Sequence, residues 1–307
     1  MKRREFFIKS AAAGIGATAY LKFGNGINLF ANTKTAPEEL YDLVAIKGGE
    51  PEAMFARAMQ SVGGMKRFVK PNQTVVVKPN IGWDVSPERA GNTNPKLIGQ
   101  IVKECFNAGA KDVYVFDHTC DNWTKCYTNS GIENAVKEAG GKIVSGASES
   151  YYQNIDVPNG KRLKDAKVHE LILDSDVFIN VPILKNHGGA TVTIGMKNMM
   201  GIVWDRKYWH RNDLHQCIAD YATLRQPDLN IIDAYWVMKR NGPRGVSTED
   251  VVTMKSQIIS TDIVAADAAA TKLFGLEPEN IPYIKYASEM GIGTMDLTKL
   301  KIDRIMM

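Results

Sequence analysis

The sequence predicts an α/β protein with a largely parallel βαβ-type sheet, because apolar strands alternate with amphipathic helices along much of the chain. The clearest stretch has a buried strand over Thr74–Pro79, a helix over Pro95–Ala108 and a strand over Lys111–Phe116. This order and spacing are typical of parallel βαβ units. A chain of 307 residues accommodates one large domain or two closely packed lobes, and both arrangements remain open.

The helix over Pro95–Ala108 is predicted from its ends and from one apolar face. Pro95 suits the first turn, where a backbone N–H is not needed, and Gly109 ends the helix. The residues of the apolar face recur at helical spacing and are Ile98, Ile101, Val102 and Cys105.

The alternation continues less regularly towards the C-terminus. Further strands are predicted over residues 142–145, 176–181, 229–233 and 257–260, and further helices over residues 130–139, 211–225 and 263–274. Residues 150–172 predict short strands that form a hairpin about Pro158–Gly160.

Residues 1–31 predict a signal peptide. Arg3 and Arg4 precede an Ala- and Gly-rich apolar stretch over 11–21, which is too short to cross a hydrocarbon core of about 30 Å. This pattern resembles the twin-arginine export signal, which implies a periplasmic or exported protein and the twin-arginine machinery as a partner. Residues 32–41 are then a linker, and residues 42–307 are the α/β domain. Whether the signal is cleaved near Ala31 or retained as an anchor is left open.

The net charge of +4 belongs to the predicted signal. Residues 1–31 hold five Lys and Arg against one Glu, which leaves 33 basic and 33 acidic residues in the remainder. A protein that binds nucleic acid needs a basic excess in its folded body, so we expect no nucleic-acid partner.

The cysteine spacing bears on cofactors. The chain has four cysteines and none forms a C-x-x-C pair, so no iron–sulfur cluster and no zinc knuckle are expected. Export to an oxidising compartment would permit a disulfide between Cys120 and Cys126.

Polar residues cluster where predicted strands end. In open α/β sheets, ligands bind beyond the carboxyl ends of the strands. The residues at these positions that are candidates to bind substrate are Lys78, Asn80, Asp117, Gly242 and Arg244, and Asp233 is a candidate catalytic residue. Each of these residues alone could instead cap a strand or the helix that follows it. Five strand ends with such polar residues at one edge of the sheet nevertheless favour a binding site.

The segment Lys185–Gly189 is the most specific candidate for a binding or catalytic site. Lys185 supplies a charge for a carboxylate or phosphate, the glycines let the backbone approach a ligand, and His187 can act as acid, base or metal ligand. Downstream, His210 is a second candidate for proton transfer or metal binding, and Lys197 and Asn198 are candidates for substrate binding.

Several familiar site patterns are absent from the sequence. His210 and His215 are five residues apart with no Glu between them, so the zinc-protease helix motif is excluded. There is also no G-x-S-x-G, no Walker A sequence and no G-x-G-x-x-G.

The combined order of these short motifs resembles an uncharacterised bacterial and archaeal family, domain of unknown function 362, over about residues 70–275. The residues that carry the resemblance are Lys78-Pro-Asn80, Thr93-x-Pro95, Ala108-Gly-Ala, Lys185-x-His187, Met196-Lys-Asn198 with Gly201, Asp233, Gly242-Pro-x-Gly245 and Asp262-x-x-Ala-x-Asp267. Many members carry an iron–sulfur module and are labelled accordingly, a module that the cysteines of this chain do not form.

A more remote resemblance, in the strand-ending Lys-Pro-Asn and in a later loop with Lys and His, is to the nickel-pincer lactate racemases. It would make Lys185 or Lys197 the lysine that holds the cofactor and His187 a nickel ligand or a proton-transfer residue.

Two functions remain in competition, besides a structural or interaction role in which the strand-end residues would be dispersed. The first is an exported enzyme that acts on a small anionic or carbonyl-bearing substrate, with or without a divalent metal or cofactor, in which Asp117 and Asp233 orient the reacting groups. The second is a non-catalytic periplasmic protein that binds a metal, a cofactor or a small ligand, for which no group needs a perturbed pKa.

Overall fold

The computed structural model describes residues 40–307, whose central element is a ten-stranded sheet. The predicted signal peptide and nearly all of the predicted linker lie outside the described residues. The strands of this sheet are β1 Leu43–Lys47, β2 Thr74–Pro79, β3 Asp112–Val115, β4 Lys142–Ile143, β7 Val177–Val181, β8 Ile183–His187, β9 Thr191–Thr193, β10 Leu229–Met238, β11 Val251–Ser260 and β12 Ile302–Met306.

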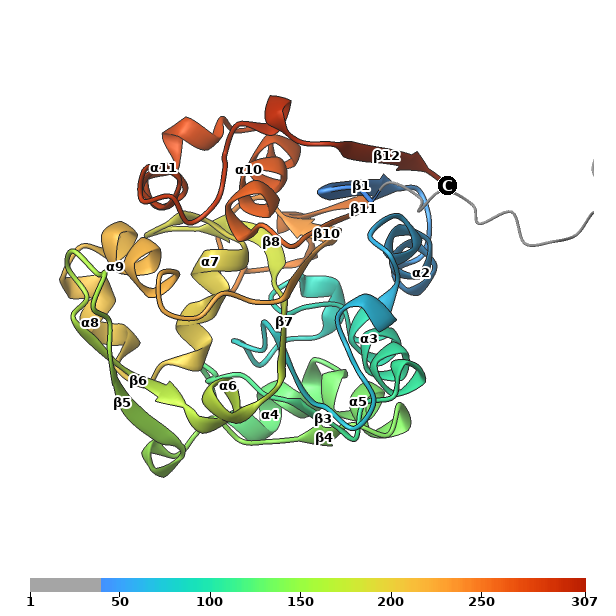
Figure 1. The fold of residues 1–307 in the computed structure, drawn as a ribbon, viewed down its shortest axis with the longest axis horizontal. Coiled ribbons are helices and arrows are strands. Elements are labelled where there is room, and N and C mark those ends of the chain that lie inside the picture. The colour runs from blue at the N-terminus through green and yellow to red at the C-terminus, as the bar shows by residue number, and fades with distance from the viewer. Residues whose placement is uncertain (1–39) are drawn as a thin grey trace, which may run out of the picture. The chain divides into compact units, whose positions relative to one another are not determined.

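Most strand pairs of the sheet are parallel, as the sequence predicted. The strand order is β12-β1-β11-β10-β7-β2-β3-β4, and β8 leaves this path to pair with β10 and β9 (Figure 1). In this sheet, as residues 40–307 describe it, the antiparallel pairs are those of β11 with β1 and β10, and of β8 with β9. The parallel block β7-β2-β3 brings the carboxyl ends of three strands to one edge.

Both faces of the sheet are covered by helices. The helices are α2 Pro51–Ser61, α3 Pro95–Ala108, α4 Trp123–Asn129, α5 Ile132–Glu138, α6 Glu170–Asp174, α7 Gly195–Asn198, α8 Arg206–Arg211, α9 Leu214–Tyr221, α10 Ile263–Phe274 and α11 Pro282–Glu289. Helices α2, α3 and α5 lie on one face and α7, α9 and α10 on the other (Figure 1). Successive residues of a strand point to opposite faces, so Val75 and Val77 enter one core while Val76 enters the other.

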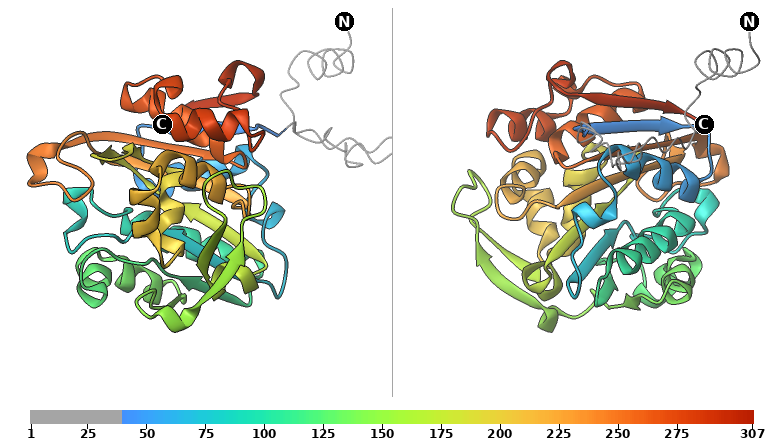
Figure 2. Two further views of the ribbon diagram at one scale, coloured as in Figure 1. Left: turned by 90° about the vertical axis from the view of Figure 1, so that its left-hand side faces the viewer. Right: turned by 45° about the vertical axis from the view of Figure 1, so that its right-hand side comes forward.

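A separate two-stranded hairpin stands beside helices α8 and α9 (Figure 2). It consists of β5 Tyr152–Asp156 and β6 Asp165–His169, which pair antiparallel as predicted. Val168 forms a bridge with Val203, and the Trp204 amide donates to the Lys167 carbonyl at 2.9 Å. These contacts fix the segment before α8 against the hairpin.

The predicted helix over residues 211–225 is shorter in the structure and is preceded by a separate helix. Asp213 adopts a left-handed backbone conformation with φ of 68°, and its side chain accepts from the Gln216 amide as the cap of α9. This break separates α8 from α9 and places His210 on the shorter helix. Among the described helices, none is both long enough and apolar enough to cross a membrane.

Candidate functional site

A cavity of about 280 Å³ lies at the carboxyl ends of β2 and β3, where the sequence predicted a site. We call it the small cavity. Residues of β2, β8, β9, α7 and α8 and of the loops after β2 and β3 line it. Its charged and imidazole-bearing lining includes Lys78, Asp117, Lys185, His187, Lys197 and Arg206.

Lys78 and Asp117 form a buried ion pair in the wall of this cavity. Lys78 Nζ lies 2.9 Å from Asp117 Oδ1, and their side chains are 0% and 3% exposed. The second carboxylate oxygen accepts from the Ile81 amide at 2.6 Å. The pair passes directly over Gly201, where an added Cβ would lie 1.8 Å from Asp117 Oδ1. Glycine at position 201 is therefore a steric requirement of the ion pair.

Lys185 is almost completely buried and points into the small cavity. Its ammonium donates to Asn80 Oδ1 at 2.9 Å and to the Gly91 carbonyl at 2.5 Å. Burial, with help from the nearby cation of Lys197, lowers the pKa of Lys185 to about 7. These two bonds use two of the three N–H groups of its ammonium, and the third has no partner among residues 40–307.

A chain of asparagine amides fixes the floor of the cavity. Asn80 Nδ2 donates to Asn198 Oδ1 at 3.0 Å, and Asn198 Nδ2 donates to Asn180 Oδ1 at 2.9 Å. Asn180 Nδ2 continues the chain to Asn230 Oδ1 at 3.1 Å. Asn198 Oδ1 also accepts from Lys78 at 2.8 Å, so the amide orientation of Asn198 is set from two sides.

Lys197 differs from the other lysines of the cavity because, among residues 40–307, no acceptor or carboxylate lies within bonding distance of its ammonium. Its side chain is nevertheless only 9% exposed. Burial, and to a smaller extent the charges of Arg206 and Lys78, lowers the pKa of Lys197 to about 8. Thr193 Oγ1 also lines the cavity and is a buried hydroxyl with no partner in the described chain. Buried polar groups are normally bonded, so these two groups mark a place for a ligand.

The ring of His187 is held in one tautomer. Its Nδ1 accepts from the amides of Gly189 and Ala190, both at 3.0 Å. On a neutral ring the proton therefore resides on Nε2, which is a donor and has no lone pair for a proton or a metal. Burial, followed by the cations of Lys197 and Lys185, lowers the pKa of His187 to about 2, so the ring is neutral at physiological pH.

His210 faces His187 across the cavity. The ring centroids are 6.2 Å apart and the rings are inclined by 14°. Burial and the charge of Lys197 lower the pKa of His210. In residues 40–307 no group of three or more His, Cys, Asp or Glu side chains is positioned to hold a metal. Two imidazoles among lysines are a poor donor set for a divalent cation, so the residues do not fit a metal and we derive no step through one.

The small cavity is strongly cationic. Lys78, Lys185, Lys197 and Arg206 line it, whereas Asp117 is its one carboxylate in the described chain. Such an arrangement attracts an anion.

Three predicted site residues do not line the small cavity. Asp233 is buried and accepts from the Asn94 amide at 2.7 Å and the Tyr235 amide at 3.0 Å, so it anchors the start of α3. The Gly242 amide donates to Asn186 Oδ1 at 2.9 Å, a contact that fixes the loop to β8. Arg244 is exposed and lies 3.5 Å from Asp121. Of this loop, Pro243 reaches the cavity.

The remaining predicted residues do meet there, together with residues to which sequence reasoning assigned no role. Arg206 donates to the carbonyls of His118 and Thr119, and the ring of His118 stacks on Trp204 with centroids 4.9 Å apart. The density of polar and aromatic residues over 204–210 was the available signal for Arg206. Cys120 also lines the cavity and is a free thiol, as is Cys126.

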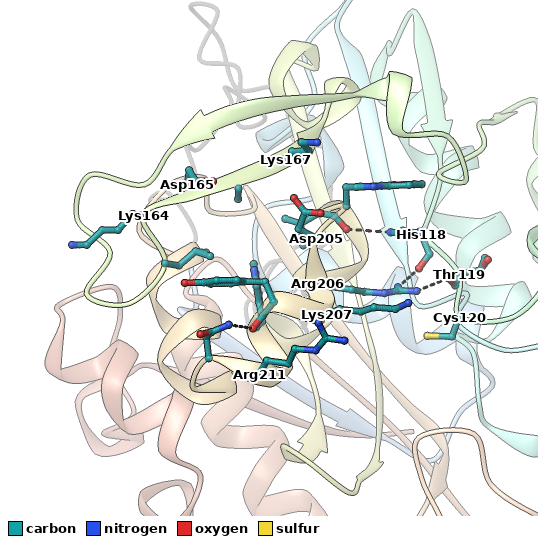
Figure 3. A pocket seen from close by; sticks show the side chains of 17 residues that line it. His118, Thr119, Cys120, Lys164, Asp165, Lys167, Asp205, Arg206, Lys207 and Arg211 are labelled. Carbon is teal, nitrogen blue, oxygen red and sulfur yellow. Dashed lines mark hydrogen bonds between the residues drawn. The ribbon is translucent and has the colours of Figure 1, made fainter.

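A second, larger cavity of about 810 Å³ adjoins the first and shares His118, Cys120 and Arg206 with it. We call it the large cavity. It lies between the β5–β6 hairpin, the loop after β3 and helix α8 (Figure 3). Its walls carry Arg206, Lys207 and Arg211.

The profile of the family described as "Domain of unknown function (DUF362)" matches residues 75–272, more than half of the chain. The chain belongs to this family. The matched range contains every residue named above as lining the small cavity.

Individual relatives are more distant. The chain is 28% identical over 255 residues to a thylakoid-associated protein of Synechocystis sp., covering 80% of this chain and 77% of that protein. Among solved structures, it is similar to the lactate racemase apoprotein of Thermoanaerobacterium thermosaccharolyticum, with 12% identity, a TM-score of 0.47, and coverage of 80% of this chain and 58% of that one. A Thermotoga maritima protein gives 11% identity, a TM-score of 0.45, and coverage of 78% and 60%. The chain thus spans less than two thirds of both solved chains.

Proposed function

We propose that this protein is an enzyme that binds a small anionic, carbonyl-bearing substrate in the small cavity and moves a proton on it. The observation that carries the proposal is Lys197, a largely buried lysine whose ammonium has no partner within residues 40–307. It lines the same cavity as Thr193, whose buried hydroxyl also has no partner there. An anionic substrate would supply the missing partner to both.

The proposed roles follow from the hydrogen bonds already present. Lys197 holds the carboxylate or another anionic group of the substrate. His187 donates its Nε2 proton to the carbonyl oxygen and, as a neutral ring, stabilises negative charge that develops there. This role as a fixed donor replaces the metal-binding and proton-accepting roles considered from the sequence.

Lys185 is the proposed base. Its pKa of about 7 leaves much of it neutral at physiological pH, and Asn80 and the Gly91 carbonyl hold its nitrogen in place. His210, on the opposite wall, is the proposed second proton-transfer group. Lys78 and Asp117 are too thoroughly engaged with each other to react, and we assign them to shaping the wall.

A twin-arginine signal would deliver this enzyme to the periplasm or the exterior. The support is the sequence of residues 1–31, and export remains part of the proposal.

Solvent deuterium exchange tests the proposal. Two-oxo and two-hydroxy acids are incubated with the protein in D₂O, and loss of the proton beside the carbonyl or hydroxyl is followed by NMR. We expect exchange by the native protein, a loss of about 100-fold or more in kcat for Lys185→Met, and a rise mainly in KM for Lys197→Met. Lys103→Met, an exposed lysine on α3, is the matched control.

His187→Gln separates a donor from a structural residue. We expect it to lower kcat while the melting temperature moves by a few degrees at most. Binding of the acids without exchange in any of them would favour the non-catalytic binding protein instead. Failure to bind any of them would contradict the proposal.

A further inference from the structure

The large cavity is a second candidate site for binding a ligand. Residues 40–307 hold 32 Lys and Arg against 31 Asp and Glu, so this part of the chain is almost neutral as a whole. The linings of the two cavities nevertheless contain eight Lys and Arg against three Asp. The remaining residues of this part of the chain hold 24 Lys and Arg against 28 Asp and Glu, so the net positive charge is concentrated in the linings of the two cavities.

Three of these cations lie on helix α8 and line the large cavity, and one of them, Arg206, also lines the small cavity. The side chains of Arg206, Lys207 and Arg211 extend in the same direction, towards the loop that carries Cys120 (Figure 3). Within the described chain, no carboxylate lies within ion-pair distance of any of the three, whereas eleven other pairs do form. Two guanidinium groups and an ammonium without carboxylates are suited to a phosphate group.

The shared wall connects this cation group to the small cavity. Arg206 lines both cavities, and its guanidinium is fixed by the carbonyls of His118 and Thr119. Trp204 and Tyr208 offer apolar surface along the large cavity. A molecule with its reacting end at Lys197 can thus extend past Arg206 and lay a carbon chain against these rings.

We infer that the substrate is an elongated organic phosphate, whose carbonyl or carboxylate end occupies the small cavity while its phosphate binds Arg206, Lys207 and Arg211 in the large one. This inference rests on the proposed function and names the class of substrate for it. It accounts for the size of the large cavity, which greatly exceeds what a small acid would fill.

Calorimetric titration with phosphonates tests the inference. Phosphonoacetate, phosphonobutyrate and phosphonohexanoate are compared with acetate, butyrate and hexanoate, and oxalate is titrated as a probe of the small cavity alone. We expect one of the longer phosphonates to bind at least about tenfold more tightly than the acid without the phosphonate. In the double variant Lys207→Gln, Arg211→Gln, the ratio of the two dissociation constants, acid over phosphonate, should fall to within about twofold of unity.

A charge-matched variant serves as control. Arg57→Gln with Lys103→Gln removes the same two charges from exposed positions on α2 and α3 and should retain the full ratio. If oxalate binds and the phosphonates gain nothing, or if the gain survives loss of Lys207 and Arg211, the inference is overturned while the proposed function stands. If oxalate also fails to bind, the proposed function fails and the inference fails with it.

Discussion

Lys78 Nζ and Asp117 Oδ1 lie 2.9 Å apart at the carboxyl ends of two neighbouring parallel strands, and both side chains are shielded from solvent. Removing one partner leaves the other as an uncompensated buried charge. We expect Lys78→Met and Asp117→Asn each to lower the free energy of unfolding by about 3–5 kcal/mol.

A double-mutant cycle in urea checks this coupling. The double variant should lose clearly less than the sum of the two single losses, because neither charge is then left alone. Strict additivity of the two losses would show that the pair is not coupled.

The glycine beneath this pair provides a steric test. Gly201→Ala places a methyl group 1.8 Å from Asp117 Oδ1, so the pair must move. We expect a loss of about 1–3 kcal/mol in stability together with weaker oxalate binding. Gly188→Ala is the control, since a Cβ there meets nothing within 4 Å. Equal stability of the two variants in chemical denaturation would rule out the steric account.

The protonation state of His187 predicts a pH dependence of stability. Its pKa is about 2 in the folded protein and about 6.5 in the unfolded chain, so the unfolded state binds the extra proton in between. The stability that the neutral His187 ring contributes is therefore fully present above about pH 6.5. As the pH falls below this value, the free energy of unfolding decreases by at most about 1.4 kcal/mol per pH unit. His187→Gln should show a shallower loss of stability between pH 6.5 and 4.5 than the native protein. Parallel profiles would mean that the ring is not held neutral.

Export can be tested independently of the site. If residues 1–31 direct twin-arginine export, Arg3→Lys with Arg4→Lys should retain the protein in the cytoplasm. Cell fractionation measures where the protein accumulates. The double variant Lys2→Arg, Lys9→Arg is a charge-preserving control and should be exported normally. Unchanged export of the Arg3→Lys, Arg4→Lys variant would contradict export by the twin-arginine route.

Local pattern predicted much of the fold. Pro95 and Gly109 bound α3 as expected, and the apolar run of β2 has the predicted limits, because these signals act within a few residues. Strand β10 is longer than predicted, since its extension depends on pairing with β11 rather than on its own apolar run. Pairing partners are distant in sequence and leave no local pattern.

The same distinction applies to the site. Lys78 and Lys185 could be chosen from the sequence because they close or follow predicted strands, and Lys197 because it lies in the polar segment downstream of His187. Asp233 has the same sequence signature, yet it anchors backbone amides, and only the three-dimensional structure separates the two roles. The tautomer of His187 depends on two amide groups in the following turn, which sequence spacing alone does not place.

The central claim is that Lys197 is a buried cation whose partner is the substrate. NMR of the protein labelled with ¹³C at the lysine ε-carbons, with Lys197 assigned by Lys197→Met, measures its titration with and without oxalate. The account predicts a pKa of about 8 in the free protein, a rise by at least about one pH unit when oxalate binds, and therefore weaker oxalate binding as the pH rises above 8. A pKa near the ordinary value of about 10.4 that does not respond to oxalate would contradict it.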